Sequence, residues 1–134
     1  MKSFVLDTSV VLKWFSKERG SEEAEKLLRF LERKKVEVFL PELVKYELGN
    51  AFLKGKELTY LRAQAILETL YMLPLNFVAE DLKLAKTSYR LAEKLGISYY
   101  DACFLALAKA RKIPLITANP KHQKTVRGVK VITF

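Results

Sequence analysis

Short strand-like segments alternate along this chain with longer segments whose apolar residues recur at helical spacing, and this alternation constrains its fold most strongly. Strands are predicted at residues 2–6, 36–40, 75–78, 114–117 and 129–133. Strands that alternate with helices predict an α/β fold with a mostly parallel sheet. A sheet of this kind binds ligands at the carboxyl ends of its strands.

Capping and breaking residues mark the ends of the intervening helices. Pro41 is expected at the first position of the helix that follows the second strand, because proline is tolerated there. A long helix is predicted over residues 79–95, and Gly96 is expected to close it. Asp81 fits the first turn of that helix, and we assign it no chemistry.

The 134 residues are expected to form one domain, spanning residues 1–134, since the chain contains no repeat or linker. Half of the residues are hydrophobic, which excludes a disordered chain. Cys103 is the only cysteine, so no internal disulfide can form, and a buried apolar role is expected for it. No signal peptide is evident, and the apolar stretches are too short to cross a bilayer, so we expect a cytoplasmic protein with no membrane partner.

The charge is strongly positive and unevenly distributed. There are 24 Lys and Arg against 15 Asp and Glu, a formal charge of +9. No acid follows Asp101, whereas the basic residues that follow it, together with the only histidine, are Lys109, Arg111, Lys112, Lys121, His122, Lys124, Arg127 and Lys130. A block of one sign favours a nucleic-acid partner. The alternative is the Lys/Glu-rich surface of a heat-adapted protein.

Two of the three aspartates stand in apolar surroundings. Asp7 directly follows the first predicted strand, and Asp101 lies among aromatic and aliphatic residues. A carboxylate in such a setting costs several kcal/mol unless it is paired, hydrogen-bonded or bound to a metal. These two residues are therefore candidates for a functional site.

The predicted topology brings further polar residues toward Asp7. Asn119 follows the fourth strand, so it shares a cleft with Asp7 if the first and fourth strands are neighbours. Glu47 lies on a partly inward face of the helix after the second strand. Asp101 begins the helix that leads into the fourth strand. Crowded carboxylates with no Cys/His pair favour a hard cation such as Mg²⁺ or Mn²⁺. Such an ion supports phosphodiester hydrolysis.

Each of these residues also has a purely structural interpretation. Asp7 could cap the helix that begins near Ser9, and Ser98-x-x-Asp101 is similar to a capping box. Glu47 could be a solvated helix residue. Thr8 and Ser9 could be ordinary helix-start residues, or they could hold Asp7 and a phosphate. Capping and metal binding are compatible, so these alternatives stay open.

Four sequence segments together resemble one family. They are VLDTS at residues 5–9, LPELVKYELGNA at 40–51, SYYDA at 98–102 and LITAN at 115–119. In this order and over nearly the whole chain, they resemble the PIN domain, in particular the single-domain VapC-type toxin ribonucleases. The resemblance implies a three-layer sandwich with a five-stranded parallel sheet of order 3-2-1-4-5 and helices on both faces.

The resemblance also implies Mg²⁺- or Mn²⁺-dependent cleavage of RNA, a homodimer, and silencing by a small antitoxin protein. By position, Asp7 and Asp101 would be the main metal-site carboxylates, and Glu47 would be the supporting acid. The residues that would orient these carboxylates are Thr8, Ser9 and Thr117.

Asn119 departs from the family pattern, since many members carry an aspartate there. Asn119 keeps a carbonyl oxygen but lacks the charge, so we expect a ligand or water-positioning role with weaker metal affinity. Lys121, Lys124 and Arg127 follow it in sequence and are expected to hold substrate phosphates.

Our leading hypothesis is a metal-dependent endoribonuclease of the toxin type, with Asp7, Glu47 and Asp101 as catalytic residues. Asn119 motivates a rival, a catalytically weak RNA- or antitoxin-binding module with the same fold. A third interpretation is a small α/β phosphotransfer domain that would use aspartyl-phosphate chemistry at Asp7.

Overall fold

The computed structural model describes residues 1–16, 21–119 and 126–134. Five strands form one parallel sheet in the order β3-β2-β1-β4-β5. They are β1 (Lys2–Leu6), β2 (Val36–Pro41), β3 (Asn76–Val78), β4 (Leu115–Thr117) and β5 (Val131–Thr133). The α/β class and the strand order 3-2-1-4-5 are therefore confirmed.

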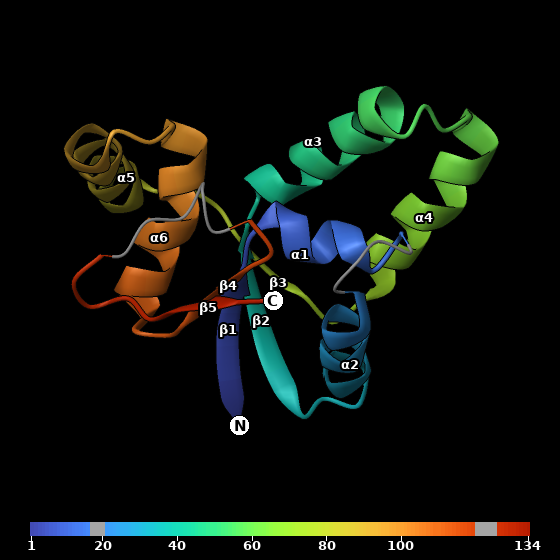
Figure 1. The fold of residues 1–134 in the computed structure, drawn as a ribbon, viewed down its shortest axis with the longest axis horizontal. Coiled ribbons are helices and arrows are strands. Elements are labelled where there is room, and N and C mark those ends of the chain that lie inside the picture. Colours follow the sequence, from blue (N-terminus) through green and yellow to red (C-terminus); the bar gives the residue numbers. More distant parts are fainter. Residues whose placement is uncertain (17–20, 120–125) are drawn as a thin grey trace.

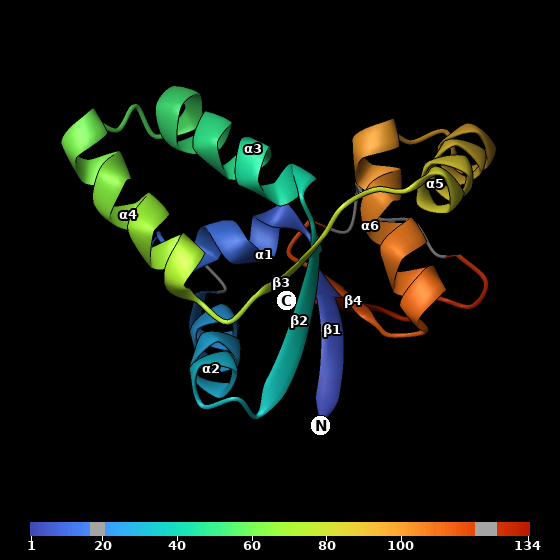
Figure 2. The ribbon, with the colours of Figure 1, turned by 180° about the vertical axis from the view of Figure 1, so that it is seen from behind.

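Helices cover both faces of the sheet. They are α1 (Thr8–Lys13), α2 (Ser21–Glu32), α3 (Leu43–Asn50) with a π-helical turn η1 (Ala51–Gly55), α4 (Tyr60–Met72), α5 (Leu82–Leu95) and α6 (Tyr99–Arg111). Figures 1 and 2 show α5 and α6 on one side of the sheet and α1 to α4 on the other. None of the helices within the described ranges has the length and apolar character needed to cross a bilayer.

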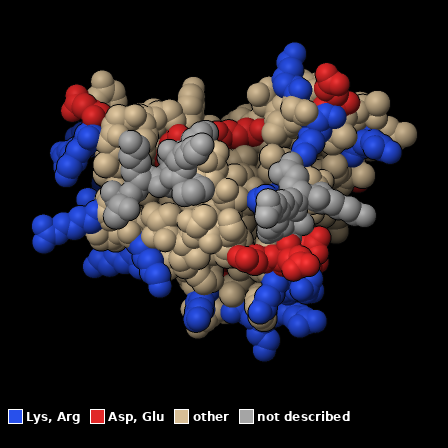
Figure 3. All heavy atoms as spheres, viewed as in Figure 1, with Lys and Arg blue, Asp and Glu red and all other residues tan. Residues whose placement is uncertain are grey.

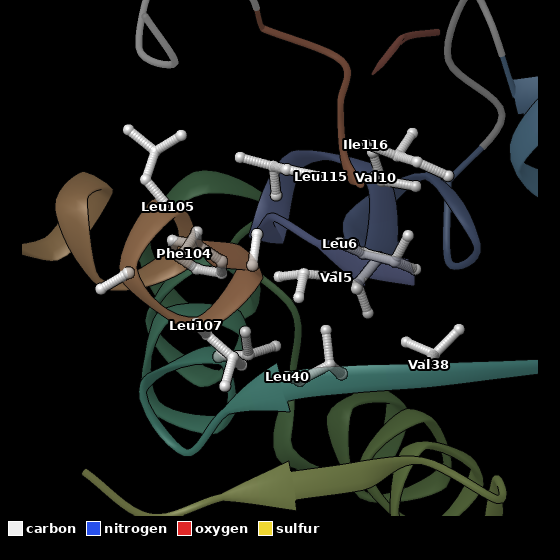
Figure 4. Packing of buried hydrophobic residues seen from close by; sticks show 14 of the residues in the cluster. Val5, Leu6, Val10, Val38, Leu40, Phe104, Leu105, Leu107, Leu115 and Ile116 are labelled. Carbon is white, nitrogen blue, oxygen red and sulfur yellow. The ribbon is translucent and has the colours of Figure 1, made fainter. Parts of the chain in front are cut away.

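The central strand β1 is buried on both of its faces. Val5 and Leu6 are fully buried although consecutive strand residues point to opposite sides of a sheet. This is the pattern of a parallel strand with helices above and below it. Figure 4 shows the cluster that results, with contributions from β1, β2, β4, α1 and α6.

Helix α6 is apolar on almost its whole circumference. Its buried residues are Ala102, Phe104, Leu105, Ala106, Leu107 and Ala108. A helix of this kind must be enclosed, and α6 packs between the sheet and α5. The packing fixes the first turn of α6, and with it Asp101, at the carboxyl end of the sheet.

Three helices begin at that same end of the sheet. Helix α1 follows β1 directly, α3 follows β2, and α6 starts after its N-cap residue Ser98. In Figure 1, the beginnings of α1, α3 and α6 gather above the carboxyl ends of β1 and β2. This is the edge where the sequence predicted a site.

Two expectations about element ends are wrong. Pro41 is the last residue of β2, paired with Val78, and is not the first residue of a helix. The amide of Glu42 donates to the carbonyl of Val78 at 3.1 Å, so pairing with β3 continues past the proline and α3 starts only at Leu43. Asp81 is the N-cap of α5, and its carboxylate accepts from the Leu84 amide at 2.8 Å. The helix therefore begins later than residue 79.

Gly96 closes α5 as expected, in the left-handed conformation with φ +66°. We predict that Gly96→Ala lowers the free energy of unfolding by about 1–2 kcal/mol, because an L-residue is strained there.

Gly49 lies inside α3, and a Cβ at either Gly49 or Gly96 would meet nothing within 4 Å. Gly49→Ala should therefore raise stability by about 0.5–1 kcal/mol. Urea unfolding midpoints measure both changes, and shifts of the same sign would contradict this account.

Candidate metal and catalytic site

One small pocket at the carboxyl end of the sheet collects most of the residues that the sequence singled out. This carboxylate pocket has a volume of about 120 Å³. It is lined by Asp7, Thr8, Ser9, Glu47, Asp101, Phe104 and Asn119. Ligand pockets for larger molecules begin at roughly 300 Å³, so this one suits an ion, a few waters or a single phosphate group.

Asp7 is the most buried of the acidic residues that the structure describes, at 5% exposure. Its Oδ1 accepts from the Ser9 amide at 3.0 Å and also from the Ser9 hydroxyl. Its Oδ2 accepts from the Thr117 hydroxyl at the end of β4. These donors compensate the carboxyl group for lost hydration, so Asp7 is held as an acceptor in a fixed orientation.

Two backbone amides direct those hydroxyl groups toward Asp7. The Ala118 amide donates to Ser9 Oγ at 3.0 Å, and the Asn119 amide donates to Thr117 Oγ1 at 3.0 Å. Each hydroxyl accepts one N–H, so its own proton is available for the carboxylate. The segment after β4 therefore orders the surroundings of a residue at the end of β1.

Glu47 faces the same pocket from α3. Thr8 Oγ1 donates to Glu47 Oε1 at 2.6 Å, which joins the start of α1 to the middle of α3. Burial raises the pKa of Glu47 above its usual range, the Thr8 hydrogen bond opposes this, and the charges of Asp101 and Asp7 raise the pKa further. The interpretation of Glu47 as a freely solvated helix residue is therefore wrong.

Asp101 enters the pocket from the first turn of α6. Its amide donates to the hydroxyl of the N-cap residue Ser98 at 3.0 Å, so the Ser98 cap is present. Asp7 is likewise the N-cap of α1. Both residues thus combine a helix-start position with a place in the pocket, and the capping interpretation does not exclude the functional one.

Phe104 was not among the candidates, because the sequence placed it in the core. It is one helical turn beyond Asp101, and residues three apart share a helix face. That spacing was the signal available in the sequence. The ring of Phe104 supplies an apolar wall to a pocket whose other residues are polar.

Of the three residues predicted to contact phosphates, only Arg127 lies in the described part of the chain. Arg127 is exposed in the turn between Val126 and Val129 and does not line the carboxylate pocket. Lys121 and Lys124 lie outside the described residues.

Thiol chemistry is disfavoured. Cys103 is only half-buried, whereas full burial was expected, and its thiol contacts Glu80 Oε1 at 3.7 Å. Burial raises the pKa of the Cys103 thiol to about 11. The thiol therefore stays protonated at neutral pH and is a poor nucleophile or metal ligand.

The pocket offers only oxygen donors, which are the ligands of a hard cation. In the described part of the chain, no three acidic, histidine or cysteine side chains form a ready-made ligand cluster. Mg²⁺ commonly binds through one or two carboxylates and keeps several waters. The donor set therefore fits a partly hydrated divalent cation. Such a cation would also relieve the repulsion of Glu47 by Asp101 and Asp7, which raises the pKa of Glu47.

The family model for the PIN domain matches residues 4–128. The chain belongs to the PIN domain family. The PIN domain fold is also found in solved structures at low sequence identity. The structure of VapBC2 from Rickettsia felis bound to a promoter DNA fragment matches with a TM-score of 0.73 at 17% identity, covering 98% of both chains. FitAcB from Neisseria gonorrhoeae matches with a TM-score of 0.72 at 23% identity, covering 96% of both.

VapBC-5 from Mycobacterium tuberculosis, a member of the VapBC family of toxin-antitoxin systems, matches over 100% of both chains with a TM-score of 0.64 at 22% identity. A comparison with curated proteins finds no match. At these identities the similarity establishes the PIN fold of the chain.

The raised pKa of Glu47 predicts a pH-dependent stability difference for Glu47→Gln. A carboxyl with a higher pKa in the folded state binds more protons when folded, so the wild type loses stability as pH rises from the unfolded pKa through the folded one. Glutamine does not titrate, and its side-chain oxygen can still accept from Thr8. The variant should therefore become progressively more stable than wild type across this interval.

Urea unfolding at a series of pH values, with chelator present, measures the difference. A difference that is independent of pH would show that Glu47 has no perturbed titration.

Proposed function

We propose that this PIN domain is a metal-dependent endoribonuclease and the toxin component of a type II toxin-antitoxin system. The observation that carries the proposal is the convergence of Asp7, Glu47 and Asp101, with Asn119, on one small pocket at the carboxyl end of the sheet. An acidic pocket in a chain with a formal charge of +9 suits a polyanionic substrate whose reacting phosphate is approached through a cation.

Asp7 and Asp101 would hold Mg²⁺ or Mn²⁺, with Asn119 contributing a neutral oxygen and Glu47 acting directly or through water. When bound, such a cation polarises a phosphoryl oxygen and lowers the pKa of coordinated water. The protein side chains would bind and orient the reacting groups and exchange protons with them.

Asp7 is suited to a fixed position because Ser9 and Thr117 donate to its two oxygens. Glu47 is suited to accept a proton from the attacking water, since its raised pKa brings it closer to neutral pH. Thr8 occupies Glu47 Oε1, which leaves Oε2 without a hydrogen-bond partner among the described residues and free for that proton. Thr8, Ser9 and Thr117 are therefore positioning residues in this proposal.

RNA is the proposed substrate, with the exposed Arg127 and with Lys121 and Lys124 contacting its phosphates. A small antitoxin and a second copy of the chain are the proposed partners, and the cytoplasm is the proposed location. The antitoxin is supported by the similar structures, several of which are toxin-antitoxin complexes. Several large apolar side chains of α4 are exposed and could serve such contacts, namely Tyr60, Leu61, Tyr71 and Met72.

The central test compares two conservative substitutions. Asp7 and Asp81 are both N-caps, and only Asp7 lines the carboxylate pocket. Asparagine caps helices about as well as aspartate, so both variants should fold. We expect wild-type RNA cleavage to require Mg²⁺ or Mn²⁺ and to stop with chelator. At saturating RNA, Asp7→Asn should lower kcat at least about 100-fold, and Asp81→Asn should leave kcat unchanged.

Equal cleavage by Asp7→Asn and wild type would sink the proposed mechanism. RNA binding without turnover by the wild type, retained in Asp7→Asn, would favour the binding module that the neutral Asn119 suggests.

Asn119 gives a gain-of-function test of the metal site. Asn119→Asp adds a charged ligand, and the affinity of oxygen-ligand sites rises with ligand charge. We expect Mn²⁺ to bind this variant on the order of tenfold more tightly, which adds about 1.4 kcal/mol of stabilisation at saturating metal. Melting temperatures across a Mn²⁺ titration measure the effect, with Asn119→Ala as the control that should gain nothing. A metal-independent shift would place Asn119 outside the ion's coordination.

A further inference from the structure

A second concave surface, of opposite charge, lies between α5 and α6. This α5–α6 groove has a volume of about 410 Å³ and shares no lining residue with the carboxylate pocket. Its charged lining residues are Lys83, Arg90, Lys109 and Arg111, with Asp81 as the one acid. The groove therefore carries a net charge of +3 on its lining, four cations less one anion.

Helical spacing explains why the cations face one groove. Lys83, Thr87 and Arg90 are four and three residues apart on α5, so they lie along one face of the helix. Lys109 and Arg111 come from the last turn of α6, which crosses next to that face. All four cations are exposed, so their charged ends reach solvent.

Within the described ranges, these four cations lack ion-pair partners. The Asp81 carboxylate is engaged as the cap of α5 through the Leu84 amide. Arg111 instead lies over the ring of Phe39, at 3.9 Å from the ring centre, which orders its guanidinium. Four like charges offset by a single aspartate repel one another, and a bound polyanion would remove that repulsion.

A merely solvated surface would mix signs, as the surface of α2 does. There Glu22, Glu23 and Glu25 stand beside Lys26 and Arg29. Figure 3 shows this difference, with acidic side chains over α2 and mainly Lys and Arg along the lower part of the flank formed by α5 and α6. The groove thus differs from the ordinary charged surface of the same protein.

We propose that the α5–α6 groove is a docking site for the phosphate backbone of the RNA substrate. This inference rests on the proposed ribonuclease function and extends it. Helix α6 carries Asp101 near its start and Lys109 eight residues later, a distance of about 12 Å along the helix axis. A strand whose scissile phosphate lies at the carboxylate pocket therefore reaches the groove within a few nucleotides.

The test removes one cation from each helix. Arg90→Ala/Lys109→Ala changes exposed helix positions to a good helix former, so folding should persist. Arg111 is left in place because it packs on Phe39. The matched control is Arg33→Ala/Lys35→Ala, which removes the same charge from exposed positions between α2 and β2.

Binding of an RNA of about 20 nucleotides is measured by fluorescence anisotropy at several salt concentrations, with chelator present so that no cleavage is needed. Losing two phosphate contacts should reduce the slope of log affinity against log salt by about 1.4 for the groove variant. The control variant should keep the wild-type slope. Equal slopes for the groove variant and the control would overturn the proposal.

A cleavage arm separates the groove from the catalytic site. With Mg²⁺ or Mn²⁺, the groove variant should show a raised KM on the long RNA and an unchanged rate on a dinucleotide, whose single phosphate would lie at the carboxylate pocket. Equal loss on both lengths would assign the effect to the pocket and overturn the proposal. Selective loss of duplex DNA binding with RNA binding intact would also overturn it.

The two proposals fail differently. If no RNA is cleaved under any metal condition but the groove variant loses its salt-dependent RNA binding, the proposed ribonuclease function is contradicted. The proposed role of the groove is then still supported. If cleavage is normal and the groove variant binds and cleaves the long RNA like wild type, the groove falls alone.

Discussion

The burial of the Asp7 carboxylate is the constraint on which this structure depends. Asp7 directly follows the central strand β1, where helices on both faces of the sheet leave it 5% exposed. An uncompensated charge there would cost several kcal/mol. Donors from the start of α1 and the end of β4 compensate it. Because one of these donors comes from β4, β1 and β4 must be neighbours for Asp7 to be buried at this position.

The interactions that stabilise Asp7 also assemble the rest of the pocket. Thr8, the next residue, donates to Glu47 and so ties α3 to α1. The amides that orient the hydroxyls of Ser9 and Thr117 belong to the segment that ends in Asn119. Asp101 arrives independently, because the buried faces of α6 fix its first turn against the sheet. Hydrogen bonding therefore positions Asp7, Glu47 and Asn119. Core packing positions Asp101.

Much of this could be predicted from the sequence, because the strongest signals were local. Carboxylates beside apolar runs marked Asp7 and Asp101, and alternating strands and helices predicted their common edge. The amide-to-hydroxyl relay could not be predicted, since it needs the relative position of residues more than 100 apart in sequence. Pro41 was misplaced for a similar reason: its pairing with Val78 is a tertiary contact that overrides the usual preference of proline for a helix start.

Two surfaces of the fold, the carboxylate pocket and the α5–α6 groove, carry charges of opposite sign. Asp7 receives donors on both oxygens, whereas Glu47 receives one and remains exposed to the repulsion of its neighbours. The pocket therefore keeps part of its repulsion unrelieved, as functional sites commonly do at the expense of stability. The α5–α6 groove keeps the opposite repulsion. In the proposed function, a phosphodiester with its cation would neutralise both at once, since the cation would bind the carboxylates and the neighbouring phosphates would bind the lysines and arginines.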